Sequence, residues 1–148
     1  MKKYQIIILL SIFALINATY LSIKAYDLLW GASSMMPPSS FCDINTTFSC
    51  TNAIVHGKTQ IFGIPFPMIA LGVYPIILIL AILGNIRKRV LEAKILVVLS
   101  FFGVCFNAYI ITQEVLYVHS YCILCLLCTA IIISIFLLSL CIIKNQKK

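Results

Sequence analysis

Charged residues are scarce in this chain. Only 10% of its 148 residues are charged and only four are acidic, whereas 62% are hydrophobic. Soluble domains carry about 25% charged and about 45–50% apolar residues. The composition therefore argues against a soluble domain and predicts one membrane domain over residues 1–148. The sequence also lacks any motif for a flavin, a nucleotide or a haem, which leaves the chemistry to its side chains and to a reactant dissolved in the membrane.

Long apolar runs are what the chain has instead. A membrane span needs about 20 such residues to cross a hydrocarbon core about 30 Å thick, and in lipid its backbone must bond internally as a helix. The sequence thus predicts an all-α integral membrane protein, a four-transmembrane-helix bundle with a long extracytoplasmic loop between helices 1 and 2. The predicted spans are about 4–23, 64–83, 95–112 and 121–143, and the loop is about 24–63.

The few basic residues predict the orientation. Nine Lys and Arg residues lie at the two termini and in the middle connection, and only Lys24 and Lys58 lie in the other connections. The positive-inside rule then places both termini in the cytoplasm of a multi-pass cell (inner) membrane protein. We interpret the basic runs as topology signals, not as a nucleic-acid surface. The first segment has the general form of a signal peptide but lacks a clean small-x-small cleavage site, so we expect it to be retained.

Two cysteine pairs are the main functional signal. Cys42 and Cys50 lie in the predicted loop, and Cys122-Ile-Leu-Cys125 begins the last apolar segment. The predicted topology places both pairs at the extracytoplasmic face. Two dithiols at one membrane surface indicate an electron relay, so these four cysteines are the candidate catalytic residues.

The spacing of the second pair suits redox chemistry. Residues three apart lie on one side of a helix, with their Cα atoms about 5–6 Å apart, as a disulfide requires. We expect Ser120 to cap this helix and Cys122 to lie in its first turn, where the helix dipole stabilises a thiolate. Cys125 would lie about 4.5 Å deeper, where it can meet a reactant in lipid. We expect the loop disulfide to be exposed and labile.

The other three cysteines are given lesser roles. Cys141 lies about 24 Å beyond Cys125 along the helix, too far to join the relay. We interpret Cys105 and Cys128 as packing residues, although Cys128 could line the same pocket as Cys125.

The motifs Cys42-Asp43-(six residues)-Cys50, Phe62-Gly63-Ile64-Pro65 and Tyr121-Cys-Ile-Leu-Cys125 resemble the vitamin K epoxide reductase family. The closer resemblance is to bacterial members that support disulfide formation, here without a fused thioredoxin domain. It implies a quinone (ubiquinone or menaquinone) near the outer end of a four-helix bundle. It also implies that a separate thioredoxin-fold protein passes electrons to the loop pair, then through Cys122 and Cys125 to the quinone. The residues alone leave open which loop cysteine meets Cys122; the resemblance points to Cys50.

The chain departs from the family pattern at two positions. His56 stands where many members have a serine, and Thr129 stands where the animal enzymes have a tyrosine. The second departure argues against vitamin K epoxide as the natural substrate.

A quinone pocket is expected to be apolar with a few placed polar groups. The candidates for its lining are Phe62, Phe66, His56, Asn107 and Cys128. Gln113, Glu114 and His119 are further polar candidates that we interpret as solvated or capping residues, and Asn17 as a bridge between helices.

Three alternatives compete with the quinone relay. Cys122, Cys125 and Cys128 could bind a soft metal such as Cu(I). A second four-span family of quinone-dependent thiol oxidases carries its CxxC in the first outer loop, which is the reverse of the order here. An assembly factor with an inert loop disulfide is the third. Thiol trapping and metal analysis separate the first reading from the relay.

Overall fold

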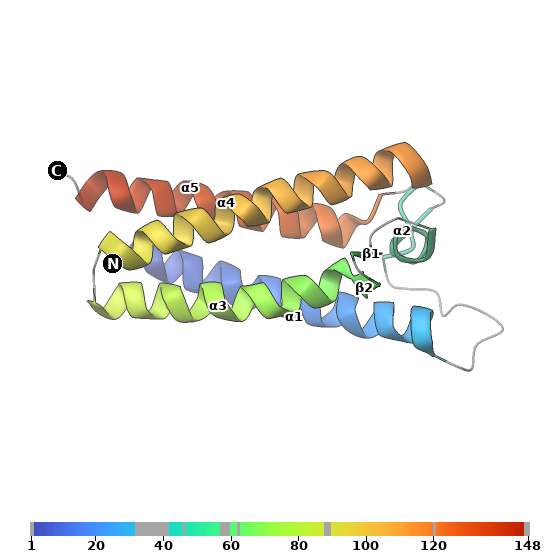
Figure 1. The fold of residues 1–148 in the computed structure, drawn as a ribbon, viewed down its shortest axis with the longest axis horizontal. Helices are drawn as coiled ribbons and strands as arrows, with labels where there is room; N and C mark the ends of the chain where they lie inside the picture. The colour runs from blue at the N-terminus through green and yellow to red at the C-terminus, as the bar shows by residue number, and fades with distance from the viewer. Residues whose placement is uncertain are drawn as a thin grey trace.

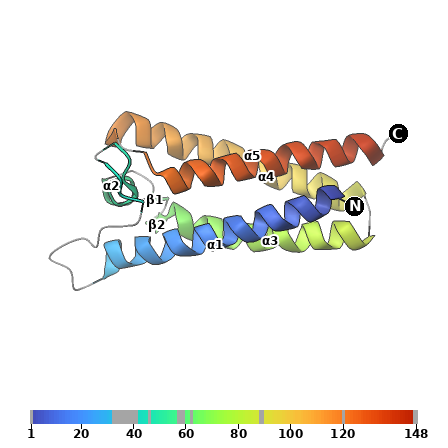
Figure 2. The same cartoon turned by 180° about the vertical axis from the view of Figure 1, so that it is seen from behind.

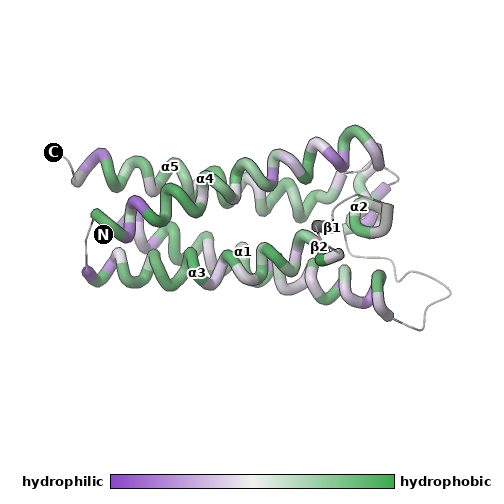
Figure 3. Tube along the Cα trace, in the orientation of Figure 1, coloured by the Kyte–Doolittle hydropathy of each residue, from purple (hydrophilic) through white to green (hydrophobic). Residues whose placement is uncertain are grey.

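The protein is described by a computed structural model that covers residues 2–31, 42–45, 47–56, 60–61, 63–87, 90–119 and 121–146. Four of its helices are long and apolar enough to cross a membrane, which confirms the predicted all-α four-span fold. Figure 3 shows apolar residues along most of their length and hydrophilic residues gathered toward their ends. They are α1 (Lys2–Trp30), α3 (Phe66–Arg87), α4 (Val90–Gln113) and α5 (Ile123–Gln146).

The long helices form two packed pairs. Helix α1 packs along α3, and α4 packs along α5, as Figures 1 and 2 show from opposite sides. Both termini lie at one end, which we call the terminal end, where the Lys3 ammonium group donates a hydrogen bond to the Cys141 carbonyl (3.3 Å). The opposite end, which we call the cysteine end, carries the short helix α2 (Cys50–His56) and the hairpin of β1 (Gln60–Ile61) and β2 (Ile64–Pro65).

The start of the second span differs from the prediction. Ile64 and Pro65 were expected to begin that span, but they pair with Ile61 and Gln60 as an antiparallel hairpin, and the helix begins at Phe66. Gly63 lies in the turn with φ of 80°, a conformation that glycine adopts without steric cost. The hairpin thus ends the loop at the mouth of the bundle.

The connection after the third span also differs. The residues between the predicted spans 95–112 and 121–143 were expected to connect two helices, yet Glu114–Val118 continues α4 as a π-helical turn, η1. The His119 N–H closes this turn on the Glu114 carbonyl (3.1 Å), and His119 then leaves the helix with φ of 52°. Single π-helical turns occur frequently at functional sites, and this one lies directly before the CxxC segment.

The surface and interior of the bundle differ as expected for a membrane protein. Large apolar side chains on every long helix are exposed, among them Leu9 (69%), Ile86 (71%) and Phe102 (65%). Inside, α1 contributes the small residues Ala14 and Ala18, which let helices approach closely in lipid. The outward apolar faces therefore suit a hydrocarbon solvent.

Candidate active site: four cysteines at one end of the bundle

The two cysteine pairs meet in one buried cluster. Cys42, Cys50, Cys122 and Cys125 pack together with Leu21 and Ala53. Cys42 and Cys50 form a disulfide with their Cα atoms 5.8 Å apart, while the CxxC residues are free thiols. The predicted convergence of the pairs is therefore present in the structure.

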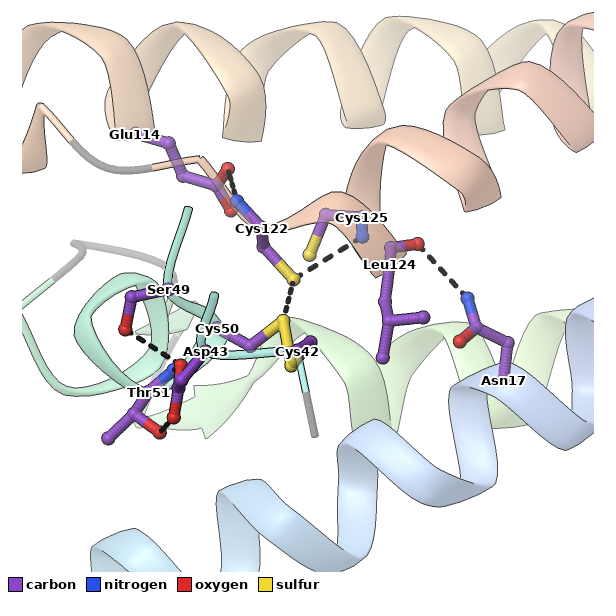
Figure 4. The surroundings of a disulfide bond; sticks show 10 residues. All are labelled: Asn17, Cys42, Asp43, Ser49, Cys50, Thr51, Glu114, Cys122, Leu124 and Cys125. Carbon is purple, nitrogen blue, oxygen red and sulfur yellow. Dashed lines mark hydrogen bonds between the residues drawn. A yellow bond between two sulfur atoms is a disulfide. The ribbon is translucent and has the colours of Figure 1, made fainter. Parts of the chain in front are cut away.

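Asp43 organises the segment that carries the disulfide. Its carboxylate accepts hydrogen bonds from the Ser49 hydroxyl (2.8 Å), the Thr51 hydroxyl (2.6 Å) and the Thr51 backbone N–H (3.1 Å), as drawn in Figure 4. The last of these satisfies an N–H in the first turn of α2, which begins at Cys50. A short carboxylate side chain thus holds the first turn of α2, with Cys50 in it, close to Cys42.

A backbone bridge ties the loop to the segment before α5. The Tyr121 N–H donates to the Thr47 carbonyl (2.7 Å), Phe48 and Tyr121 form a parallel bridge, and their rings lie with centroids 6.0 Å apart. Because Cys50 follows Phe48 by two residues and Cys122 follows Tyr121 directly, the bridge brings these two cysteines face to face.

The closest approach between the pairs is from Cys122 to Cys50. The Cys122 thiol donates to Cys50 Sγ at a sulfur–sulfur distance of 3.1 Å. Thiol–disulfide exchange requires one sulfur to reach the other, so these two sulfurs are in position for it, with the second sulfur of each pair, Cys42 and Cys125, as the leaving or resolving group.

Cys122 occupies a different helical position from the one predicted. It precedes α5, which begins at Ile123, and its Sγ accepts the Cys125 backbone N–H (3.4 Å). That is the bond an N-cap side chain makes to the third residue of a helix. The sulfur itself therefore caps α5, the role we had assigned to Ser120, which lies outside the described residues. The expectation that a helix start stabilises the Cys122 thiolate stays a prediction.

The exposure of the loop pair contradicts our expectation. We predicted an exposed disulfide, but Cys42 and Cys50 are 4% and 1% exposed, less than the 7% of Cys125. The reason is the folded state of the loop: the Asp43 network and the Tyr121 bridge press α2 onto the ends of α1 and α5. The loop pair is therefore not more exposed to solvent than Cys125, which we had expected to lie deeper.

Glu114 lies beside the cysteines and is 1% exposed. Its Oε2 accepts a long hydrogen bond from the Cys122 backbone N–H (3.5 Å), and its side chain also interacts with the Cys125 thiol. We had interpreted this residue as solvated or capping, which is wrong. The π-helical turn that begins at Glu114 keeps its side chain on the inner face of α4 while Leu116 and Tyr117 remain outside.

Phe66 lines two small cavities, and one of them adjoins the cluster. One cavity also touches Cys125 and Glu114. The other, of about 40 Å³, is lined by apolar side chains together with Asn107 and Tyr74. Its polar groups are few, as in small-molecule sites, but its volume is far below the roughly 300 Å³ at which such sites begin. The residues suit a quinone chemically, and binding would require the side chains around Phe66 to move apart.

Asn107 and Asn17 connect helices beside the CxxC segment. Asn107 Oδ1 accepts the Thr129 hydroxyl (3.2 Å). The Asn17 amide donates to the Leu124 carbonyl and to Cys128 Sγ, both at 3.0 Å, so the predicted bridge between helices is confirmed. Both contacts hold the first turns of α5 in place.

The remaining candidates have separate places. Cys128 is buried among core residues and lines neither of these two cavities. Cys105 is exposed, and Cys141 lies at the terminal end. Phe62 and the side chain of His56 lie outside the described residues. Among the side chains that the structure describes, no group of three or more His, Cys, Asp or Glu could hold a metal ion.

A regular spacing in α4 could have identified Glu114 from the sequence. The buried polar residues Ser100, Asn107 and Glu114 follow one another at intervals of seven. Positions seven apart lie on the same side of a helix, so a carboxylate in that series is expected to face the interior. The contacts of Asp43 carry no comparable signal.

Comparison with known families agrees with this geometry. The family model described as vitamin K epoxide reductase family matches residues 5–140, which includes all four cysteines of the cluster. A search of curated proteins finds no match to the chain.

Proposed function

The chain belongs to the vitamin K epoxide reductase family, which makes it a membrane thiol oxidoreductase. From that premise we propose that it oxidises an extracytoplasmic thioredoxin-fold protein and reduces a membrane quinone. Electrons pass through Cys42 and Cys50, then through Cys122 and Cys125. The oxidised thioredoxin-fold protein then introduces disulfide bonds into exported proteins. The observation that carries the proposal is the 3.1 Å approach of Cys122 Sγ to Cys50 Sγ inside one buried cluster.

The exchange between the pairs runs through the two facing sulfurs. The Cys50 thiolate attacks Cys122 Sγ, and the Cys122–Cys125 bond breaks with its electron pair going to Cys125. The Cys42 thiolate then attacks Cys50 Sγ, and Cys122 leaves as a thiolate. The products are a Cys42–Cys50 disulfide and a reduced CxxC pair, the arrangement of bonds that the described chain has.

The position of Cys122 supports its part in this exchange. Its Sγ accepts the Cys125 backbone N–H at the start of α5, which places it where helix-start amides face a sulfur that leaves during exchange. Cys125 lines the cavity that Phe66 and Ile110 also line, and from there it can pass electrons to a membrane oxidant.

A bound quinone would supply the oxidising power by accepting two electrons and two protons. Phe66, Tyr74 and Asn107 are the residues that would hold it, because they line the apolar cavity near the CxxC helix. Phe62 and His56 remain proposed members of the same site. Cys128 would contribute only through its packing against Tyr74 and Asn17.

The orientation follows from the charges. Nine of the eleven Lys and Arg residues belong to the termini and to residues 87–94, and those of them that the structure describes belong to the helix ends at the terminal end. With that end in the cytoplasm, the cysteine end faces the compartment where disulfides form.

Quinone reduction by the purified protein tests the proposal. Reduced thioredoxin-fold protein is supplied as electron donor and a short-chain ubiquinone or menaquinone as acceptor, and absorbance follows the quinone. We expect steady quinol formation that Cys125→Ala abolishes, whereas Cys105→Ala, an exposed cysteine outside the cluster, leaves the rate unchanged. Absence of quinol formation with either quinone would overturn the proposal.

Metal analysis on the same preparation tests the alternative. The relay predicts cysteines that cycle between thiol and disulfide under acid-quenched alkylation. Stoichiometric bound copper or zinc, with no disulfide between Cys122 and Cys125 under any redox condition, would favour the metal-binding reading instead.

A further inference from the structure

Glu114 is the one carboxylate of the described chain that lies among the cysteines of the cluster. It is 1% exposed, and burying a carboxyl group in apolar surroundings costs several kcal/mol unless a partner compensates. A structural role would be served as well by a neutral amide. The relay, however, moves protons as well as electrons, and its exchange steps need a proton donor and a proton acceptor.

The partners of Glu114 are the reacting residues themselves. Its Oε2 faces the Cys122 backbone N–H (3.5 Å), and its side chain interacts with the Cys125 thiol. In Figure 4 it extends from its helix toward the stretch that joins Cys122 to Cys125. One carboxyl group is thus placed against both members of the CxxC pair.

Among the described residues, the rest of the lining of the cavity that Glu114 shares with Cys125 is apolar. From every element packed around it, the described side chains that share its cavity are Leu21 of α1, Ala53 and Ile54 of α2, Phe66 and Pro67 of α3, and Ile110 of α4. The titratable groups that face it within the described residues are the thiols of Cys125 and, across the helix start, Cys122. A proton on Glu114 therefore has the CxxC thiols as its nearest exchange partners.

We propose that Glu114 is the acid–base residue of the Cys122/Cys125 pair, an inference that rests on the proposed function. When Cys50 attacks Cys122, the bond to Cys125 breaks and Cys125 receives the electron pair as a thiolate. The Glu114 carboxylic acid gives that thiolate its proton and becomes a carboxylate. Of the two protons that the loop thiols release on forming their disulfide, one passes to the Cys122 thiolate and the other leaves the cluster, so Glu114 remains a carboxylate.

The reverse proton movement serves the next step. Oxidation of the CxxC pair starts from the Cys125 thiolate, and the Glu114 carboxylate accepts the proton that the thiol must lose. That proton restores the Glu114 acid for the next exchange, while the Cys122 proton and one further proton from solvent go with the two electrons to the acceptor. General acid–base assistance of this kind contributes typically 10²–10⁴-fold to a rate, and here it would operate where water is excluded.

Transfer between the two pairs can be measured without quinone and without a protein partner. Fully oxidised protein in detergent is mixed with limiting dithiothreitol, quenched with acid at intervals and alkylated, and mass spectrometry reports the redox state of each pair. We expect Glu114→Gln to slow the appearance of CxxC thiols by on the order of 100-fold, and Glu114→Asp to restore part of the rate.

Glu92 provides the matched control. It is a second buried glutamate on α4, 7% exposed, about 33 Å away along the helix at 1.5 Å per residue. Glu92→Gln removes the same charge from the same helix at the terminal end, and we expect it to leave the transfer rate unchanged. Thermal unfolding of all variants accompanies the rates, so that loss of folding is separated from loss of proton transfer.

The pH profile distinguishes proton transfer from a structural effect. The step needs the Cys50 thiolate, which forms as pH rises, and the Glu114 acid, which disappears as pH rises. The wild-type rate should therefore be bell-shaped in pH, and Glu114→Gln should lose the alkaline decline. A Glu114→Gln protein with the wild-type rate, or a slow one that keeps the alkaline decline, would overturn the inference.

The failure of the inference can be told apart from the failure of the proposed function. If quinone reduction is absent while transfer between the pairs is fast and sensitive to Glu114→Gln, the acceptor is wrong and the role of Glu114 stands. If quinone reduction proceeds and Glu114→Gln transfers like the wild type, the relay stands and the role of Glu114 is wrong.

Discussion

The two ends of the bundle treat their buried polar groups differently. At the cysteine end, Asp43, Glu114 and Asn107 all have hydrogen-bond partners. At the terminal end, Tyr4 Oη and Glu92 Oε2 are buried, and no described residue hydrogen-bonds to either atom. Both ends thus bury a glutamate of α4, but only one of them places it against thiols.

This difference separates chemistry from packing. Buried polar groups are costly unless they are satisfied. At the cysteine end, where Ser22 Oγ is also buried without a described partner, the contacts of Asp43 and Glu114 also position sulfurs. The terminal end is held by close helix packing, as where Gly84 meets the Tyr4 ring. Substitutions at the cysteine end should therefore alter electron transfer, and substitutions at the terminal end should alter stability alone.

Double substitutions that leave one cysteine in each pair should have the largest effect on electron transfer. Cys42→Ser/Cys125→Ser leaves Cys50 and Cys122 as the free pair of the cluster, 3.1 Å apart, and we expect them to form a stable disulfide on mild oxidation. Cys50→Ser/Cys125→Ser leaves Cys42 and Cys122 as the free pair, and this protein should form little disulfide under the same conditions. Both proteins should lose turnover. Peptide mapping without reduction identifies the bond, and a Cys42–Cys122 bond formed as readily would refute the assigned order.

Loosening the loop should have a smaller effect on transfer. In Asp43→Asn an NH₂ group replaces one carboxylate oxygen and cannot accept the hydrogen bonds that Ser49 and Thr51 donate. Hydrogen bonds to charged groups are worth about 1.5–3 kcal/mol. Since 1.4 kcal/mol corresponds to a factor of ten, transfer between the pairs should fall roughly tenfold. The exposed Asp27→Asn, also toward the cysteine end, is the control. An unchanged rate would mean that the network does not position Cys50.

Removing the bridge between α1 and α5 should affect stability more than rate. Asn17→Ala abolishes the bonds to the Leu124 carbonyl and Cys128, and interhelical hydrogen bonds in membranes are worth about 0.6 kcal/mol on average. We expect a lower midpoint of thermal unfolding in detergent and a fall in transfer smaller than that of Asp43→Asn. Thr19→Ala, which loses only a bond within α1, should be close to the wild type.

The smallest effect on transfer is expected at the terminal end. A methyl group at Gly84 would meet the Tyr4 ring at 2.5 Å, whereas one at Gly72 would meet nothing within 4 Å. Gly84→Ala should cost about 1–3 kcal/mol through forced repacking, seen as a lower unfolding temperature, and Gly72→Ala should cost little. A slower electron transfer in Gly84→Ala would break the separation between the two ends.

The spans and the pairing of the cysteines could be predicted from local signals. Apolar runs of sufficient length must be helices in lipid, and Cys122 and Cys125 are close because helix geometry makes them so. The limits of the helices were less predictable, since Ile64 and Pro65 form a strand of the hairpin and Glu114 begins a π-helical turn.

The burial of the loop pair could not be predicted, because it depends on contacts between distant segments. Cys50 and Cys122 are 72 residues apart, and their approach rests on the Tyr121 bridge and on how Asp43 folds the loop. Polarity of a sequence suggests exposure, but here the polar side chains satisfy one another and leave the sulfurs enclosed.

The order of reduction within one turnover tests the central claim most directly. Fully oxidised protein is mixed rapidly with the reduced thioredoxin-fold donor, quenched with acid and alkylated, and the two pairs are quantified separately by mass spectrometry. The relay predicts that Cys42 and Cys50 become thiols first, that Cys122 and Cys125 follow as the loop pair reoxidises, and that Cys50→Ser prevents the second phase. Reduction of Cys122 and Cys125 at the wild-type rate in Cys50→Ser would contradict it.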